Sequence, residues 1–250
     1  GEARIAPDLS RFVAGTAWVE ASWGQPVRYD PLALARRALD FPLFCAEQSA
    51  TRVLALATTP GLFPAAEERE ARLAGAIAAL LDKQRWDGAF SLWGANGEAD
   101  PWISAYATEA LLRARDSGAT VPQAALDSAL AGLARDAEDV APDKPEEFAD
   151  QAYRLHVLAL AGRPLPGATR RLSEQLTRLP TPIARAQLGA ALARIGQQGR
   201  AEAAFATVRV TVAAETARAG ADFVAVSAGV WSYGEGEAAA VKAFNLALKT

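Results

Sequence analysis

The spacing of apolar and polar positions predicts helices along most of the chain. From Asp30 to about Thr207, apolar residues recur at helical spacing in segments of roughly 10 to 20 residues, and Gly, Pro and Asp stand in the joints between them. We therefore expect an all-α fold. The predicted helices cover 32–39, 65–81, 102–115, 122–134, 145–161, 168–179 and 182–195, and a further helix starts near Cys45.

The composition of these segments suggests how the helices pack. Many of them carry alanine where a two-layer bundle needs leucine, which favours close antiparallel pairs that stack as an open solenoid or close into a ring. The segment QRWDGAF at 84–90 is typical of a turn that crosses a helix pair, with Gly88 free to take a positive φ and Phe90 returning to the core. Such turns recur in toroids, so we expect an alpha/alpha toroid of paired antiparallel helices.

The two ends of the chain differ from this pattern. Residues 17–23 are rich in strand formers and predict a short flanking β segment, which either belongs to a neighbouring β domain or pairs with the alternating residues 208–212. Residues 223–226 and 230–233 could also be strands. The expected division is a flanking segment at 1–24, a helical domain at 25–207 and an unassigned tail at 208–250.

Composition excludes several classes of function. Lys+Arg 26 against Asp+Glu 29 leaves a net charge of −3, without the basic excess that nucleic acid or an anionic membrane requires. With Cys 1 and His 1, an intrachain disulfide and a multi-cysteine or multi-histidine metal site are excluded, so no metal or cofactor is predicted. No apolar run is long enough to insert in a membrane and no secretory signal is visible, while Met 0 and Gly1 suggest a piece of a longer precursor.

The single cysteine stands three residues before a glutamine. At the start of a helix, Cys45 and Gln48 lie on one face, where the sulfur can reach the side-chain carbonyl carbon. Displacement of ammonia from the amide would give an internal thioester, an acyl group that reacts with amines, hydroxyls or water. Such a bond needs shelter from water, for which Phe41, Leu43 and Phe44 supply apolar side chains. The alternative interpretation is an inert buried cysteine, since free cysteine is usually buried.

Three blocks of sequence, in a fixed order, give this pair its context. They are FPLFCAEQSATR at 41–52, QRWDGAF at 84–90 followed by WISAYATEAL at 102–111, and FADQAYRL at 148–155. Together with residues 8–19, these blocks resemble the thioester region of the bacterial alpha-2-macroglobulin family. The resemblance runs from about Asp8 to about Thr207, and 208–250 show no match.

This resemblance implies a function as well as a fold. It implies a ring of paired helices with the thioester at one edge. This ring would be one domain of a larger periplasmic protein, which can be anchored in a membrane. In that family a protease cuts a bait segment, and the uncovered thioester bonds covalently to the attacker. Cys45 and Gln48 match the reactive pair, and Glu47 matches an acidic residue without an evident role. The implied partners are target proteases and other domains of the parent, and the chain is not expected to be an enzyme.

Two departures from the family and two alternatives remain. Phe41 and Phe44 replace a tyrosine and a glycine, which either tightens the shielding or weakens reactivity. His156 does not match the histidine that complement relatives use, and we expect it to be structural.

One alternative function is that of a terpene cyclase or prenyltransferase relative, although the acidic run 136–139 has the wrong pattern for substrate ionisation. The other is a non-reactive helical scaffold that binds a partner protein.

Overall fold

The computed structural model describes residues 36, 37, 39, 44–59, 66–139 and 142–218. In this part of the chain all regular elements are helical and no strand is present, apart from one isolated bridge between Gln84 and Phe90. The expectation of an all-α fold is confirmed. The helices are α2 (Ala46–Thr58), α3 (Ala66–Leu81), α4 (Pro101–Asp116), α5 (Gln123–Asp139), α6 (Pro145–Leu160), α7 (Pro166–Ser173), α8 (Pro182–Arg194) and α9 (Gln198–Arg218).

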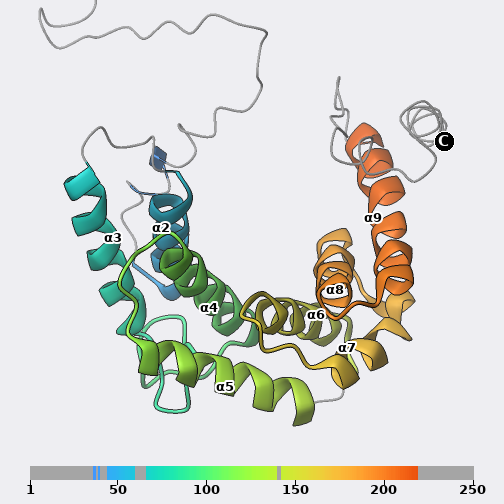
Figure 1. The fold of residues 1–250 in the computed structure, drawn as a ribbon, viewed down its shortest axis with the longest axis horizontal. Coiled ribbons are helices and arrows are strands. Elements are labelled where there is room, and N and C mark those ends of the chain that lie inside the picture. Colours follow the sequence, from blue (N-terminus) through green and yellow to red (C-terminus); the bar gives the residue numbers. More distant parts are fainter. Residues whose placement is uncertain (1–35, 38, 40–43, 60–65, 140–141, 219–250) are drawn as a thin grey trace, which may run out of the picture.

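The helices form two layers that follow one arc (Figure 1). Helices α2, α4, α6 and α8 pack against one another in that order, and α3, α5, α7 and α9 each pair with the helix that precedes them in the sequence. This alternation of an inner and an outer helix is the arrangement of an alpha/alpha toroid. The flanking strand predicted for 17–23 lies outside the described residues.

Small side chains bring the inner helices close together. In α4, Ala105, Ala107, Ala110 and Ala114 are fully buried beside Leu111. Alanine lets the backbones of two helices approach without a gap, because its side chain fills little space and loses no rotamer freedom on burial. Larger apolar residues of α6 and α8 complete the core; among them are Leu155, Leu158, Leu188 and Leu192. None of the described helices combines the length and apolar character needed to cross a bilayer.

Helix starts follow the capping residues and prolines of the sequence. The Asp100 side chain accepts a hydrogen bond of 2.9 Å from the backbone N–H of Ile103, and Pro101 occupies the first helical position of α4. Thr181 and Pro182 start α8 in the same way. These two helices and α6 begin within one residue of the expected positions. The backbone N–H groups of Asp100 and Ala46 donate to the carbonyls of Phe90 and Leu92, so α4 and α2 begin beside the same loop.

Two sequence expectations differ from the structure. The apolar pattern predicts one helix over 168–179, but α7 ends at Ser173 and a 3-10 turn follows at Leu176–Arg178. Leu172, Leu176 and Leu179 keep a helical spacing across this break, so the apolar pattern does not reveal it. Of the two options for the segment 17–23, pairing with a strand at 208–212 is contradicted, because α9 continues to Arg218. Alternation in so short a segment is thus weak evidence for a strand. The rest of the expected division of the chain stays a prediction.

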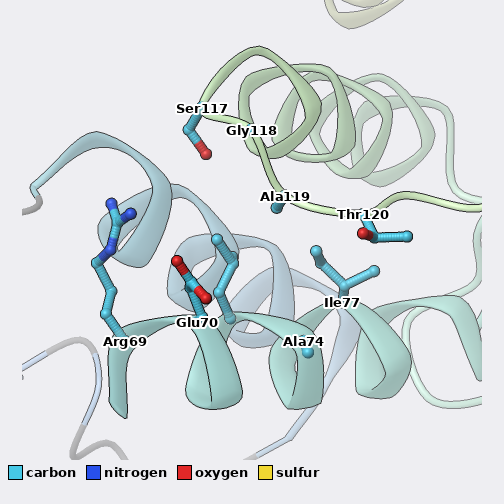
Figure 2. A pocket seen from close by; sticks show the side chains of 9 residues that line it. Arg69, Glu70, Ala74, Ile77, Ser117, Gly118, Ala119 and Thr120 are labelled. Atoms are coloured by element: carbon cyan, nitrogen blue, oxygen red, sulfur yellow. The ribbon is translucent and has the colours of Figure 1, made fainter. Parts of the chain in front are cut away.

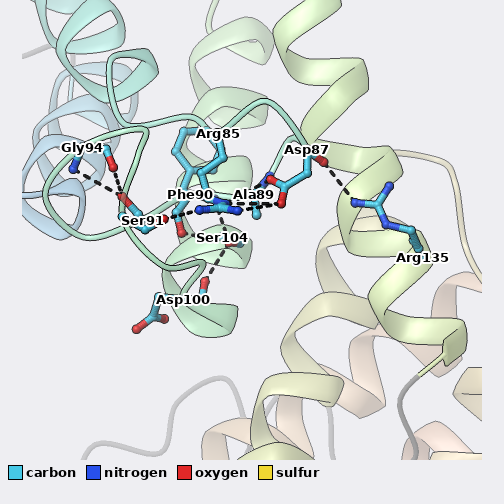
Figure 3. A network of polar contacts seen from close by, with 10 residues as sticks. Arg85, Asp87, Ala89, Phe90, Ser91, Gly94, Asp100, Ser104 and Arg135 are labelled. Carbon is cyan, nitrogen blue, oxygen red and sulfur yellow. Dashed lines mark hydrogen bonds and ion pairs between the residues drawn. The ribbon is translucent and has the colours of Figure 1, made fainter.

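The predicted crossing turn joins α3 to α4 and contacts α5. Gly88 has a φ of +90°, and the Gln84 side chain donates to the backbone carbonyl of Ala125 at 2.8 Å. Figure 3 shows Asp87 between the Arg85 guanidinium at 3.1 Å and Arg135, which donates to the Asp87 backbone carbonyl at 3.1 Å. The hydrogen bond from Arg85 holds the pKa of Asp87 below its usual value. The contacts of Gln84 and of Arg135 are both made between the turn and α5, so the turn is pinned to that helix.

Candidate functional site

Cys45 lies at the N-terminal end of α2, as the residue that caps the helix. Its φ of −67° and ψ of 170° are extended, which is the usual conformation at such a cap. The residue is only 3% exposed. The next residue, Ala46, donates its backbone N–H to the carbonyl of Leu92 at 2.8 Å. The loop that follows the crossing turn is therefore attached to the start of α2, next to the cysteine.

The structure brings the two candidate reactive residues into contact. The Cys45 sulfur lies against Oε1 of the Gln48 side chain, and the backbone N–H of Cys45 donates to the same oxygen at 3.1 Å. Cys45 and Gln48 thus form a reciprocal capping box around the first turn of α2. The predicted proximity on one helix face is present. In addition, the side-chain carbonyl of Gln48 faces the positive end of the helix dipole.

The shielding of this pair differs from what the sequence suggests. Phe44 is 59% exposed, and the Arg52 guanidinium lies 4.2 Å from the centre of its ring, a cation–π contact. Its ring therefore does not enclose the sulfur. Phe41 and Leu43 lie outside the described residues. Within the described part of the chain, the buried neighbours of Cys45 along α2 are small, namely Ala46, Ser49 and Ala50.

A polar network holds the other side of the same turn. The Thr51 hydroxyl donates to the backbone carbonyl of Glu47 at 2.8 Å and lies 2.9 Å from the hydroxyl of Tyr106 in α4. Trp102 stacks on the Tyr106 ring with 4.9 Å between ring centres. Burial raises the pKa of Tyr106, so its phenol stays protonated. The sequence pattern places Tyr106 only in a buried helical stripe, because the contact with Thr51 spans 55 positions.

His156 lies elsewhere on the inner layer. The charged groups that influence it are Glu109, Arg113 and Arg194, which belong to the C-terminal halves of α4 and α8. Burial lowers the pKa of His156 and keeps it neutral, and its Nδ1 atom has no hydrogen-bond partner among the described residues. Cys45 stands at the opposite, N-terminal end of its helix. Nothing in the described contacts links His156 to the Cys45–Gln48 pair.

Other features of the described chain do not form a second centre. No group of three or more His, Cys, Asp or Glu residues within the described ranges could hold a metal ion. A pocket of about 300 Å³ lies between α3 and the turn after α4 (Figure 2). Arg69, Glu70 and Ile77 line one side of it, and backbone and small side chains around Gly118 line the other. Neither Cys45 nor Gln48 lines this pocket.

Comparison with known proteins gives relatives of one kind over most of the chain. No family model matches it. Alpha-2-macroglobulin of Escherichia coli K12 is 31% identical over 204 residues, which cover 70% of this chain and 12% of that protein. Alpha-2-macroglobulin of Xylella fastidiosa Temecula1 is 34% identical over 184 residues, which cover 66% of this chain and 11% of that protein. A 42-residue match to thiamine-phosphate synthase of Hyphomonas neptunium, 55% identical and covering 17% of this chain and 19% of that enzyme, is too short to show a family.

Solved structures agree with this. Native Escherichia coli alpha-2-macroglobulin, from domain MG7 to the C-terminus, matches 88% of this chain and 38% of its own with a TM-score of 0.68 at 22% identity. Salmonella alpha-2-macroglobulin reacted with methylamine matches 87% of this chain and 16% of its own with a TM-score of 0.65 at 23% identity. Escherichia coli alpha-2-macroglobulin activated by porcine elastase matches 72% of this chain and 18% of its own, at 30% identity with a TM-score of 0.62. This chain is homologous to bacterial alpha-2-macroglobulin over about two thirds of its length.

Proposed function

We propose that this chain is the thioester domain of a protease-trapping inhibitor, and that Cys45 and Gln48 form the internal thioester. The observation that carries the proposal is the contact between the Cys45 sulfur and the Gln48 side-chain carbonyl at a buried helix start. Homology to alpha-2-macroglobulin supports the protease-inhibitor family. The chain spans only 12% and 11% of those two relatives, so the trapping activity of the whole protein is part of this proposal.

Formation of the bond needs no cofactor. The Cys45 sulfur attacks Cδ of Gln48, a C–S bond forms, and the amide nitrogen leaves with the thiol proton as ammonia. The carbonyl oxygen that becomes negative in the tetrahedral intermediate is Oε1, to which the Cys45 backbone N–H already donates at 3.1 Å. This donor and the positive end of α2 stabilise that charge without reorganisation.

Acyl transfer uses the same carbonyl. When an attacking protease cuts the bait segment and the thioester is uncovered, a lysine amine of the protease attacks Cδ of Gln48. An amide bond forms, the C–S bond breaks, and Cys45 takes up the proton as a free thiol. A hydroxyl gives an ester and water gives a glutamate by the same steps. Proximity of the bound protease supplies most of the rate, with effective molarities of about 10⁵ M or more.

The setting we propose follows from this chemistry. The partners are target proteases, joined covalently, and the other domains of a longer parent protein, which shelter the bond before cleavage. The periplasm is the proposed compartment, since an inhibitor there meets proteases that arrive from outside the cell. The Escherichia coli relative was activated by porcine elastase and the Salmonella relative was reacted with methylamine. A protease and a small amine are therefore suitable probes for this chain.

The mass of the native full chain tests the proposal. We expect a value about 17 Da, one ammonia, below the sequence mass, and the addition of one methylamine on treatment with release of one thiol. Cys45→Ala should restore the full mass and remove both responses. A full-mass protein that is inert to methylamine would leave the helical scaffold as the function. Methylamine addition that persists in Cys45→Ala would place the reactive acyl group elsewhere.

The enzyme alternative has a different signature. A terpene cyclase or prenyltransferase relative requires an acidic or metal-bound centre that ionises an isoprenoid diphosphate, and it predicts diphosphate release with Cys45 intact or replaced. Measurement of diphosphate release from such a substrate separates it from the thioester proposal. We expect none, because the reactive pair acts on an acyl carbon and not on a phosphate ester.

A further inference from the structure

One side chain of α4 is hydrogen-bonded to α2 just after the turn that carries Cys45 and Gln48. Tyr106 is a half-buried residue whose hydroxyl lies 2.9 Å from the Thr51 hydroxyl of α2. Its ring is held from behind by Trp102, stacked at 4.9 Å with 20° between the planes. Thr51 stands one helical turn after Glu47, which directly precedes Gln48, and its hydroxyl lies 2.8 Å from the Glu47 backbone carbonyl.

The direction of these hydrogen bonds follows from counting protons. A backbone carbonyl only accepts, so the single Thr51 proton is donated to Glu47. Tyr106 must then donate its own proton to the Thr51 oxygen. The order is Tyr106 hydroxyl, Thr51 hydroxyl, Glu47 carbonyl. This chain of donors holds the first turn of α2 from the side of α4, while the Leu92 carbonyl holds Ala46.

We propose that Tyr106, acting through Thr51, is a positioning residue for the thioester: it fixes the turn that carries Cys45 and Gln48 and thereby slows loss of the bond to water. This inference rests on the proposed function. Tyr106 does not touch the reacting atoms in the described contacts, so it acts on the geometry of the turn. Without the Tyr106 hydroxyl, the Glu47 carbonyl still accepts the Thr51 proton, but Thr51 is no longer hydrogen-bonded to α4. The first turn then opens more often, and water reaches the acyl carbon more often.

A second tyrosine offers a matched control. The Tyr153 hydroxyl of α6 donates to the Glu109 carboxylate of α4 at 2.7 Å. Tyr153 is more deeply buried than Tyr106, at 5% exposure, and its hydrogen bond is charge-assisted. Loss of the Tyr153 hydroxyl should therefore destabilise the fold at least as much as loss of the Tyr106 hydroxyl. The hydroxyl makes no described contact with α2, and phenylalanine keeps the ring that lies 6.4 Å from the Trp102 ring, so the reactive turn should be unchanged.

The experiment measures the lifetime of the thioester in the full chain at neutral pH without added amine. The reporter is the fraction of molecules that keep the mass deficit of one ammonia, followed over time beside the thermal unfolding midpoint. For Tyr106→Phe and for Thr51→Val we expect loss about three- to tenfold faster than in the wild type, the range that one hydrogen bond gives to an opening equilibrium. Thr51→Ser keeps the hydroxyl and should restore the wild-type lifetime.

Two comparisons decide the outcome. The double variant Tyr106→Phe with Thr51→Val should be no faster than Thr51→Val alone, because both changes break the same chain of donors. Tyr153→Phe should lower the unfolding midpoint without shortening the lifetime. Equal lifetimes for Tyr106→Phe and the wild type, or equal shortening in Tyr153→Phe, would overturn the inference and leave the proposed function intact. Absence of the mass deficit in the wild type would overturn the proposed function itself.

Discussion

Replacement of Gln48 by asparagine is expected to abolish methylamine incorporation and to return the native chain to its full sequence mass. The asparagine side chain is shorter by one methylene, about 1.5 Å, so its carbonyl carbon no longer reaches the Cys45 sulfur from the same backbone position. Reactions between held groups depend steeply on such distances, and we expect incorporation to fall by at least about a hundredfold. Intact-mass measurement before and after methylamine treatment checks this result.

Glutamate at the same position separates chemistry from helix capping. Gln48→Glu keeps the length of the side chain and the oxygen that accepts from the Cys45 N–H, and glutamate is a favoured residue at this place in a capping box. It has no amide nitrogen to expel, so no thioester forms. We expect a fully folded, methylamine-inert protein. Amine incorporation that survived in Gln48→Asn would show that another side chain carries the acyl group.

Substitution of Gly88 by alanine in the crossing turn is expected to lower the free energy of unfolding strongly. The φ of +90° is unfavourable for an alanine, and the added Cβ would lie 2.1 Å from the backbone carbonyl oxygen of Ser128 in α5. The backbone of the turn or the backbone of α5 must therefore shift. We expect a loss of about 2–4 kcal/mol in the free energy of unfolding. Urea or thermal unfolding of the full chain gives the measurement.

Gly118 provides the matched control for this change. It has almost the same φ, +92°, but no described atom lies within 4 Å of the position that an added Cβ would take. Gly118→Ala should thus cost only the conformational part, about 1–2 kcal/mol. The difference between the two variants measures how tightly the turn is packed on α5. Equal losses would mean that α5 yields to the added methyl group and that contact with Ser128 does not constrain the turn.

Much of the fold could be predicted because its signals are local. Proline and capping residues at the starts of α4, α6 and α8, and glycine at the crossing turn, act on their own backbone and need no knowledge of the neighbours. The break after Ser173 could not be predicted from apolar spacing, which continues through Leu176 and Leu179. Residues 208–212 alternate as a strand does, yet α9 extends through them, which the local pattern does not reveal.

The candidate site divides in the same way. Cys45 and Gln48 are three residues apart, so helix geometry alone predicts that they meet. The position of Tyr106 against Thr51 depends on how α2 and α4 pack, and no local pattern contains it. Phe44 illustrates the opposite failure. An aromatic residue next to the cysteine suggests a cover for the sulfur, whereas the Phe44 ring is largely exposed and lies against the guanidinium of the half-buried Arg52.

The 3% exposure of Cys45 has a practical consequence for anyone who follows the bond with thiol reagents. A sulfur set free by acyl transfer at this buried position reacts with a bulky maleimide only when the residues around it open. Labelling of the Cys45 thiol is then slower than the mass change that marks acyl transfer. The delay between the two signals reports how far the domain relaxes after the thioester is broken.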